Sequence, residues 1–355
     1  MNQIQKYIAV LEKTGLDALL LTSQTNRYYA ATYDVAEGVA VITRHGSWYI
    51  TDSRYLEAAE KHLDGFTLLQ NDQTHSFSML IGQALSAAGA RTLGIEEQYL
   101  TLAEYEAYRD ALDAELVPCQ EELTVLRYVK EPWELELLRK AQAITDATFT
   151  ELLGIIRAGM TEKELAAELI YRLYKLGGEG LAFDPIVVSG PNSSLPHGVP
   201  SDRVIQPGDF ITMDFGAKYG GYCADMTRTV ALGYATDEMK TVYNTVLKAQ
   251  LAGIAVSKAG VLGKTVHETA AQVIRDAGYG PYFGHGYGHG VGIEVHESPS
   301  CNQRGEVPMP AGAVCSAEPG IYLPDKFGVR IEDVVVFREE GCEVLTGSPK
   351  ELIIL

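Results

Sequence analysis

The sequence lacks the features of several protein classes. No apolar run reaches the roughly 18 residues of a membrane-spanning helix, and the first residues do not have the charged-then-apolar layout of a signal peptide. No glycine-rich phosphate loop follows a strand-like segment in the first 125 residues. Cysteine is scarce, and no Cys-x-x-Cys spacing occurs among the five: Cys119, Cys223, Cys301, Cys315 and Cys342. We therefore expect a cytoplasmic protein with reduced thiols and neither a disulfide framework nor a zinc–thiolate site.

Positive charge is also scarce. The 355 residues include 29 Lys and Arg against 47 Asp and Glu, a net charge of −18. This balance argues against nucleic acid or an anionic membrane as a partner, and bound cations could offset part of it if the acids cluster. Hydrophobic residues make up 46% of the chain, as in ordinary globular proteins, and the length predicts about two domains.

Strand-like and helix-like segments alternate over residues 1–125, which predicts an α/β layer. An amphipathic helix around Ile4–Leu11 leads to a buried strand at Asp17–Thr22. Further strands are expected at Val39–Thr43, Trp48–Thr51, Phe66–Gln70, Thr92–Ile95 and Glu115–Pro118. Helices are expected at Tyr55–Leu63, His75–Ala88 and Leu102–Leu112. We predict a domain boundary near residue 125, giving domains 1–125 and 126–355.

The second domain begins with a long helix and then looks duplicated. Pro132 suits the first turn of a helix, and Trp133, Leu137 and Ile144 begin an apolar stripe that continues to Ile155. Residues 158–165 (AGMTEKEL) resemble residues 259–266 (AGVLGKTV), at an offset of 101. In each copy a helix precedes the motif, a helix follows it, and strands bearing two acids come next. The repeated order predicts two similar halves facing one another.

Two hairpins carry these acids. A turn centred between Tyr219 and Gly220 would place Asp214 directly opposite Asp225 on one sheet face, an arrangement that needs a cation or a shared proton. With a longer turn, one of the two aspartates would be a solvated residue instead. Around Pro324-Asp325-Lys326, Glu318 would face Glu332 in the same way. The apolar strand after Glu332 makes an unpaired acid there costly.

A histidine-rich stretch, residues 284–296 (GHGYGHGVGIEVH), supplies the remaining polar groups. Four carboxylates and a histidine form a mainly oxygen-ligand set that suits Mn²⁺, Co²⁺, Fe²⁺ or Zn²⁺. Two divalent ions would match the four negative charges, whereas one would leave the cluster strongly negative. We therefore infer a two-metal hydrolase site in which a bridging hydroxide is the nucleophile. His45, His62, His75 and His267 are expected to have no role in it.

These motifs identify the chain as similar to the pita-bread metallopeptidases of family M24, which include aminopeptidase P, prolidase, methionine aminopeptidase and the metal-free creatinase. The resemblance is close over residues 130–355 and looser over 1–125. It implies an α/β (α+β) fold, with a creatinase-like N-terminal domain and a pseudo-twofold pita-bread catalytic domain. The five metal ligands it implies lie in MDFG, ADMTRT, HGYGHGVG, EPGIY and VRIED: Asp214, Asp225, His289, Glu318 and Glu332.

The resemblance also implies roles for residues around the metals. His197 lies beside the substrate, and His296 contacts the scissile peptide and steadies the tetrahedral intermediate. His285 lines the pocket for the residue after the cut. Glu318 shuttles the proton from the bridging water to the leaving amine. Tyr322 and Arg330 lie near the metals and substrate. A plain loop or structural role is the alternative for His197, His285, Tyr322 and Arg330.

The resemblance, together with a first domain of this size and the complete ligand set, favours cleavage of an Xaa-Pro bond with two divalent ions, chiefly Mn²⁺, per chain. We expect a homodimer that takes peptides with proline in the second position. Some prolidases carry a basic residue shortly after the His-Glu-x-Pro segment, whereas here no arginine follows His296-Glu-Ser-Pro until Arg304. We therefore favour an Xaa-Pro aminopeptidase over a prolidase restricted to dipeptides, with Arg304 or Arg330 as the residue that could bind a dipeptide carboxylate in the alternative. A non-catalytic pita-bread protein that binds a peptide or partner is the alternative of a different class.

Overall fold

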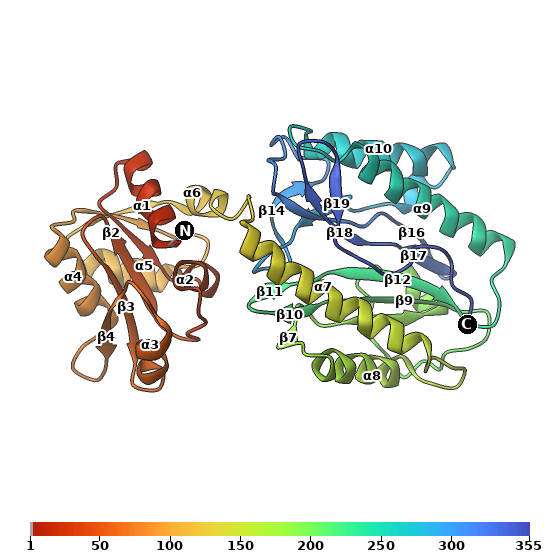
Figure 1. Ribbon diagram of the computed structural model, residues 1–355, viewed down its shortest axis with the longest axis horizontal. Helices are drawn as coiled ribbons and strands as arrows, with labels where there is room; N and C mark the ends of the chain where they lie inside the picture. The colour runs from red at the N-terminus through yellow and green to blue at the C-terminus, as the bar shows by residue number, and fades with distance from the viewer. Residues whose placement is uncertain (1–2) are drawn as a thin grey trace. The chain divides into compact units, whose positions relative to one another are not determined.

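The computed structural model describes residues 3–355 (Figure 1). The chain divides into two compact units, Met1–Arg127 and Tyr128–Leu355. Residues 1 and 2, which begin the expected first domain, lie outside the described residues. The boundary expected near residue 125 stays a prediction. Helices and strands alternate in the first unit and helices cover sheets in the second, so the expected mixed α/β architecture is confirmed.

A six-stranded sheet forms the centre of the first unit, in the order β4-β3-β2-β1-β5-β6. The strands β1, β2 and β3 pair antiparallel, while β4, β5 and β6 join in parallel. Their bounds are Ala18–Leu21 (β1), Val39–Thr43 (β2), Ser47–Asp52 (β3), Thr67–Asn71 (β4), Thr92–Ile95 (β5) and Glu115–Pro118 (β6). All residues of β1 and β2 are buried, so both faces of the central strands are covered.

Helices cover the first sheet. Helices α4 and α5 pack with β1, β2 and β5 in one apolar cluster that includes Leu20, Val41 and Leu93. The helices of this unit are Gln3–Thr14 (α1), Gln24–Ala31 (α2), Leu56–His62 (α3), Phe77–Ala88 (α4), Leu102–Ala111 (α5) and Gln120–Val125 (α6). Side chains of Ser76 and Thr101 cap α4 and α5 by accepting backbone N–H bonds. The short helix α2 was not expected from the sequence.

Two helix pairs enclose the strands of the second unit (Figure 1). The pair α7 and α8 packs on β8, β9 and β12, and the pair α9 and α10 packs on β15 to β18. The helices span Pro132–Leu153 (α7), Glu162–Lys175 (α8), Asp237–Val256 (α9) and Gly263–Asp276 (α10). Short 3₁₀ helices lie at Gly190–Ser194 (η1) and Gly280–Tyr282 (η2).

The strands of this unit form four small sheets, in the orders β11-β10-β7, β12-β9-β8, β14-β13-β15-β18-β19 and β16-β17. The first half contributes Gly180–Leu181 (β7), Ile186–Ser189 (β8), Phe210–Phe215 (β9), Ala217–Tyr219 (β10), Tyr222–Cys223 (β11) and Met226–Ala231 (β12). The second half contributes Gly288–Gly290 (β13), Glu297–Cys301 (β14), Val314–Ala317 (β15), Gly320–Leu323 (β16), Phe327–Arg330 (β17), Asp333–Phe337 (β18) and Cys342–Val344 (β19).

Equivalent hydrogen bonds join the two copies of the repeated motif to the chain that follows. Gly159 N–H donates to Ile205 O at 3.1 Å, and Gly260 N–H donates to Met309 O at 2.8 Å. Isolated bridges pair Thr161 with Val204 and Leu262 with Pro308. The motif positions again differ by 101 residues, so the short sequence match reflects a structural repeat.

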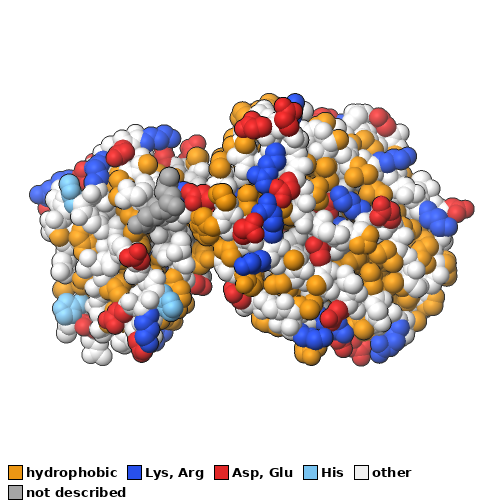
Figure 2. Space-filling view, viewed as in Figure 1, with side chains coloured by type: hydrophobic (Ala, Val, Ile, Leu, Met, Phe, Trp, Pro, Cys, Tyr) orange, Lys and Arg blue, Asp and Glu red, His pale blue; other side chains and the backbone are white. Residues whose placement is uncertain are grey.

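Figure 2 shows acidic and basic side chains interspersed with apolar ones on one face, so the net negative charge does not gather into a single patch there. Within residues 3–355, no helix combines the length and the apolar character needed to cross a membrane.

Candidate metal centre

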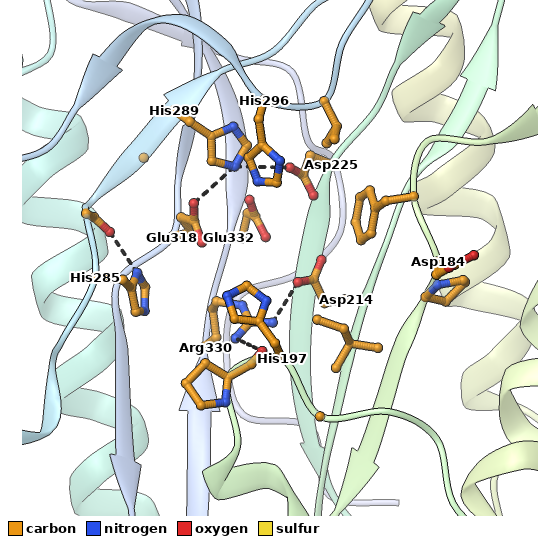
Figure 3. A pocket seen from close by; sticks show the side chains of 18 of the residues that line it. Asp184, His197, Asp214, Asp225, His285, His289, His296, Glu318, Arg330 and Glu332 are labelled. Carbon is orange, nitrogen blue, oxygen red and sulfur yellow. Dashed lines mark hydrogen bonds and ion pairs between the residues drawn. The ribbon is translucent and has the colours of Figure 1, made fainter. Parts of the chain in front are cut away.

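All ten candidate site residues line one cavity of about 880 Å³ in the second unit (Figure 3). The acids come from strand ends in both halves: Asp214 lies on β9, Asp225 precedes β12, Glu318 follows β15, and Glu332 precedes β18. The histidines and remaining residues come from loops and from β13, β16 and β17: His197, His285, His289, His296, Tyr322 and Arg330. The cavity also takes in Asp184 and Arg304.

The first acid hairpin has a different register from the expected one. Asp214 pairs with Thr227, and Tyr219 pairs with Tyr222, so Gly220 and Gly221 are the two central turn residues. Both glycines have positive φ, 52° and 76°, as a type I′ turn requires. The expectation that Asp214 and Asp225 lie directly opposite is therefore wrong. Asp225 lies two residues before Thr227, just before the start of β12, and thus stands diagonally from Asp214.

The second acid hairpin has the expected register. Leu323 pairs with Phe327 around a turn in which Asp325 has a φ of 60°, and Gly320 pairs with Arg330. Ala317 pairs with Asp333 in the next ladder, so Glu318 and Glu332 occupy the interruption between the two ladders. At this interruption the halves of the unit join, because Glu332 N–H donates to Thr227 O at 3.1 Å.

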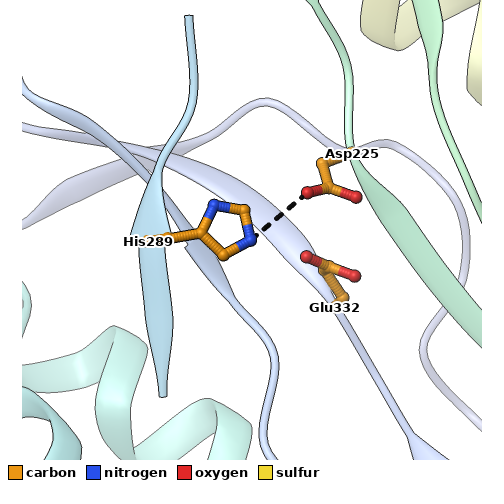
Figure 4. Close-up of side chains that lie close together, drawn as sticks. All are labelled: Asp225, His289 and Glu332. Atoms are coloured by element: carbon orange, nitrogen blue, oxygen red, sulfur yellow. Dashed lines mark ion pairs between the residues drawn. The ribbon is translucent and has the colours of Figure 1, made fainter. Parts of the chain in front are cut away.

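Three candidate ligands from three elements already form a compact group. Ligand atoms of Asp225, His289 and Glu332 all lie within 4.8 Å of one another (Figure 4). His289 Nε2 lies 3.5 Å from Asp225 Oδ2 and 3.2 Å from Glu318 Oε1. His289 Nδ1 lies 3.1 Å from Gly290 O, so it carries the proton and donates to that carbonyl. This bond directs Nε2 toward the acids, the orientation that a metal-binding imidazole needs.

The acids perturb one another because little water reaches them. Burial and the neighbouring carboxylates, Glu332 first among them, raise the pKa of Asp225 well above its ordinary value. Burial and Glu318 raise the pKa of Glu332 in the same way. Burial also raises the pKa of Asp214, although Arg330 opposes this effect. Such a cluster is unfavourable as four bare anions and becomes favourable when cations share it.

Glu318 and His289 form an ion pair within this cluster. Burial would raise the pKa of Glu318, but the hydrogen bond and charge of His289 lower it to about 2. Burial would lower the pKa of His289, but Glu318 raises it to about 9. A metal ion at His289 Nε2 would replace the proton that this pair shares.

Arg330 connects the acids to the outer residues. Its Nη2 donates to Asp214 Oδ2 at 2.6 Å, and its Nη1 donates to Tyr322 Oη at 2.8 Å. His285 Nε2 lies 3.0 Å from Tyr322 Oη, and His285 Nδ1 donates to Gly286 O at 2.8 Å. Burial lowers the pKa of His285, so its neutral ring accepts from the tyrosine hydroxyl. The hydrogen bonds are therefore donated in one direction: Arg330 donates to Tyr322, and Tyr322 donates to His285.

His296 and His197 lie at the more open part of the cavity. The ring of His296 meets the ring of His289 edge-on, with centroids 4.1 Å apart. Burial and the charge of His289 lower the pKa of His296, which favours a neutral ring that can donate or accept one hydrogen bond. His197 is exposed on the loop that follows η1.

Two hydroxyl residues that the sequence reasoning missed support the acids. Thr227 Oγ1 donates to Glu332 Oε2 at 2.6 Å and accepts from Arg330 Nε at 2.9 Å. Ser316 Oγ donates to Glu318 Oε1 at 3.1 Å and accepts from His289 N–H at 3.0 Å. Each lies two positions from a candidate ligand acid along the chain. Because side chains alternate along a strand, that spacing was an available signal.

The donor set fits divalent metal ions. Asp214 Oδ1 is buried and has no hydrogen-bond partner, so it has an unused acceptor directed into a cavity with three further carboxylates. The cations near the four acids are Arg330, which is engaged by Asp214, and protonated His289. Oxygen ligands with one imidazole suit Mn²⁺, Fe²⁺, Co²⁺ or Zn²⁺ better than a thiolate-selective metal.

Comparisons with known proteins agree with this chemistry. Residues 136–339 match the model for metallopeptidase family M24, and residues 3–129 match that for the creatinase/prolidase N-terminal domain. An Xaa-Pro dipeptidase from Bacillus anthracis superimposes with a TM-score of 0.96 at 41% identity, covering 99% of both chains. An X-Pro aminopeptidase from Thermotoga maritima superimposes with a TM-score of 0.94 at 39% identity, covering 100% of both. An uncharacterized peptidase of Bacillus subtilis is 41% identical over 99% of this chain and 100% of its own.

Proposed function

Because the chain belongs to metallopeptidase family M24, we propose that it is an Xaa-Pro aminopeptidase, which cleaves the bond between an N-terminal residue and a following proline. The observation that carries the proposal is the convergence of Asp225, His289 and Glu332, with Asp214 and Glu318 beside them, in one cavity. An Xaa-Pro bond is a tertiary amide, and its hydrolysis needs a polarised carbonyl and a protonated leaving nitrogen.

In this proposal Asp214, Asp225, His289, Glu318 and Glu332 hold two divalent ions, with Mn²⁺ as the first candidate and Co²⁺, Zn²⁺ and Fe²⁺ as alternatives. Such ions would polarise the scissile carbonyl and lower the pKa of water enough to supply hydroxide near neutral pH. The family implies divalent metal binding. The buried, partnerless Oδ1 of Asp214 and the raised pKa of Asp225 support cation binding by these residues.

The remaining steps belong to protein side chains. Glu318 takes the proton of the attacking water and passes it to the proline nitrogen as the C–N bond breaks. His296 and His197 hydrogen-bond to the carbonyl oxygen and the peptide near the scissile bond. His285, held by Tyr322, lines the pocket for the proline side of the substrate. Arg330 keeps the Asp214 carboxylate oriented through its bonds to Asp214 and Tyr322, and both Arg330 and Tyr322 lie beside the substrate in this proposal.

Substrate length separates the proposal from its main alternative. The cavity volume of about 880 Å³ lies toward the upper end of the roughly 300–1,000 Å³ typical of ligand pockets, which supports room for a peptide longer than two residues. Arg304 also lines the cavity, and its guanidinium has no hydrogen-bond or ion-pair partner among residues 3–355. That observation favours the alternative, an Xaa-Pro dipeptidase in which Arg304 binds the carboxylate after proline.

We also propose that the protein acts as a homodimer in the cytoplasm. All five cysteines are free, which supports a reducing compartment.

The direct test compares substrates and metals. Metal-stripped protein, reloaded with Mn²⁺ or Co²⁺, should release alanine from Ala-Pro-Ala faster than from Ala-Pro and leave Ala-Ala-Ala intact. Stripping should reduce the rate by roughly 10²-fold or more, because several kcal/mol of transition-state stabilisation depend on the metal. Preference for Ala-Pro that disappears in Arg304→Ala would replace the aminopeptidase with the dipeptidase. If reloaded protein cleaves neither proline substrate, the Xaa-Pro proposal is wrong.

A further inference from the structure

The loop that carries His197 is fastened at both ends to one buried carboxylate. Residues 189–201 leave β8 at Ser189, pass through η1 and His197, and reach Ser201. Glu162, in the first turn of α8, lies between these two ends and is fully buried. Glu162 lies in the repeated motif at residues 158–165 but does not line the cavity, and the metal chemistry does not account for it.

Glu162 accepts hydrogen bonds from three loop residues. Oε1 accepts from Ser189 N–H at 2.6 Å and from Ser189 Oγ at 2.8 Å. Oε2 accepts from Ser201 N–H at 3.0 Å and from Ser201 Oγ at 2.6 Å. Asn192 Nδ2 lies 3.1 Å from Oε1 and 3.2 Å from Oε2. One carboxylate thus closes the loop by uniting its first residue, its 3₁₀ turn and its last residue.

Other contacts join the closed loop to the metal centre. Gly328 N–H donates to Ser193 Oγ at 2.9 Å, and Arg330 Nη1 donates to Pro196 O at 3.2 Å. A Cβ on Gly328 would lie 2.1 Å from Ser193 O, so β17 and the loop are in close backbone contact. His197 directly follows Pro196. Its backbone position therefore depends on the loop closure by Glu162 and on the bond from Arg330.

In the second half of the unit, the equivalent segment is closed without a carboxylate. Lys163 N–H donates to Ser201 O, and Lys264 N–H donates to Gly305 O, so Glu162 and Ser201 correspond to Gly263 and Gly305. A Cβ on Gly263 would lie 2.1 Å from Ser300 O, and a Cβ on Gly305 would lie 2.7 Å from the same oxygen. There a backbone carbonyl fills the position that the Glu162 side chain fills in the first half. The carboxylate is thus specific to the half that carries His197.

We propose that Glu162 is a positioning residue: it closes the 189–201 loop and thereby holds His197 where it contacts the substrate. The inference rests on the proposed Xaa-Pro peptidase function for the role of His197, while the loop closure itself does not depend on that function. Replacing Glu162 by Gln keeps the side-chain volume but exchanges one acceptor oxygen for an NH₂ donor. This NH₂ group would face loop groups that also donate, so the loop should open locally.

A double-mutant cycle tests the coupling. In the metal-loaded full chain, Glu162→Gln should lower kcat/KM for the proline substrate by roughly 10- to 100-fold, as expected for a displaced contact group. In a His197→Ala background, the same change should cost less than about twofold, because the group that Glu162 positions is already gone. Bound metal should be unchanged in every variant. If Glu162→Gln fails to fold, Ser201→Ala, which removes one of the six contacts, should show a smaller effect with the same dependence on His197.

Glu96 is the matched control. It is also fully buried and accepts from two backbone N–H groups, a serine hydroxyl and an asparagine amide, but all of these belong to the first unit: Thr22, Ser23 and Asn26. Glu96→Gln should alter kcat/KM equally with and without His197. Amide hydrogen exchange should increase within residues 190–200 in Glu162→Gln and stay unchanged there in Glu96→Gln.

The outcomes are separable. Equal losses from Glu162→Gln in both backgrounds, unchanged exchange of the loop, or an inert His197→Ala change would each overturn the positioning role. If wild-type protein cleaves no Xaa-Pro peptide while the loop still opens in Glu162→Gln, the proposed function fails and the loop closure stands.

Discussion

Arg330 shows how one side chain makes an acid cluster possible in a buried cavity. Arg330 is 4% exposed, and its guanidinium donates to Asp214, Tyr322, Thr227 and Pro196. Its planar group of donors suits this simultaneous binding, which a lysine could not reproduce. Each bond orients a group that contacts either the acids or the His197 loop. A buried arginine of this kind stabilises the arrangement of the site.

Glu318 is the residue for which loss of a carboxylate should affect chemistry most. Glu318→Gln keeps the shape and can keep the bond from Ser316, but an amide cannot carry the proton from water to the leaving nitrogen. We expect kcat to fall by roughly 10²- to 10⁴-fold at saturating metal, with thermal unfolding close to wild type. Glu306→Gln, at an exposed glutamate paired with Lys264, is the control. Turnover within a few fold of wild type would remove Glu318 from proton transfer.

Individual candidate residues were predictable where a motif carried them. All ten line one cavity, although their separate roles stay predictions. Thr227 and Ser316 were missed because a hydroxyl beside an acid has no distinctive sequence signal beyond its alternate spacing. The diagonal placement of Asp214 and Asp225 was missed because the turn was centred one residue too early. The strand pairing and the positive φ at both glycines determine the turn, and neither is visible in the sequence.

The turn between β10 and β11 determines where Asp225 lies. Because Gly221 has a φ of 76°, Gly221→Val forces a branched residue into the left-handed region and should destabilise the second unit by about 1–2 kcal/mol. Gly221→Asn should cost less, since asparagine tolerates this region. Trp133 contacts Tyr222 beside the turn, so its fluorescence during urea unfolding, in a Trp48→Phe background, reports this unit. Equal midpoints for Val and Asn would contradict the assigned turn.

Elements with apolar periodicity were predicted well, and elements held by distant groups were not. The six strands of the first sheet lie within a residue or two of their expected bounds. Helix α2 has a polar sequence, and its N-terminus is satisfied by Glu96, 73 residues away from Ser23. In α7 the predicted stripe began one position off: Trp133 and Leu137 are half-buried, whereas Leu135 and Leu138 are buried. Which face of a long helix is covered depends on packing that periodicity alone does not resolve.

The repeated halves explain why so many acids meet. Each half contributes two carboxylates at strand ends, and the halves join beside these acids through a bond from Glu332 N–H to Thr227 O. Folding therefore concentrates negative charge that the unfolded chain would disperse in water. The repulsion among these acids lowers the stability of the metal-free protein, and bound cations would remove that repulsion.

The clustering of acids should make the free energy of unfolding depend on pH in a direction that can be measured. In the metal-free protein, the raised pKa values of Asp225 and Glu332 mean that the folded state keeps protons that the unfolded state releases above about pH 4. The stabilising charge of His289, whose pKa is raised to about 9, is present below about pH 6.5 and is lost as the pH rises through 9. The lowered pKa of Glu318, about 2, affects only more acidic solutions. The raised pKa values of Asp225, Glu332 and His289 therefore predict lower stability at pH 8.5 than at pH 5.5, by up to about 1.4 kcal/mol per pH unit for each group that titrates. The lowered pKa values of His285 and His296 act in the opposite direction only up to about pH 6.5, where the unfolded state has released the same protons.

Saturating Mn²⁺ should reverse the slope, because metal binding displaces the same protons and strengthens as the pH rises. The measurement is the free energy of unfolding in urea at both pH values, with EDTA or with Mn²⁺. Asp225→Asn removes one buried charge, so without metal it should be more stable than wild type at pH 8.5 and gain less from Mn²⁺. A metal-free wild type that becomes more stable between pH 5.5 and 8.5 would show that the acids are not the dominant titrating groups. The metal centre would then not be the main cause of the pH-dependent loss of stability in the metal-free protein.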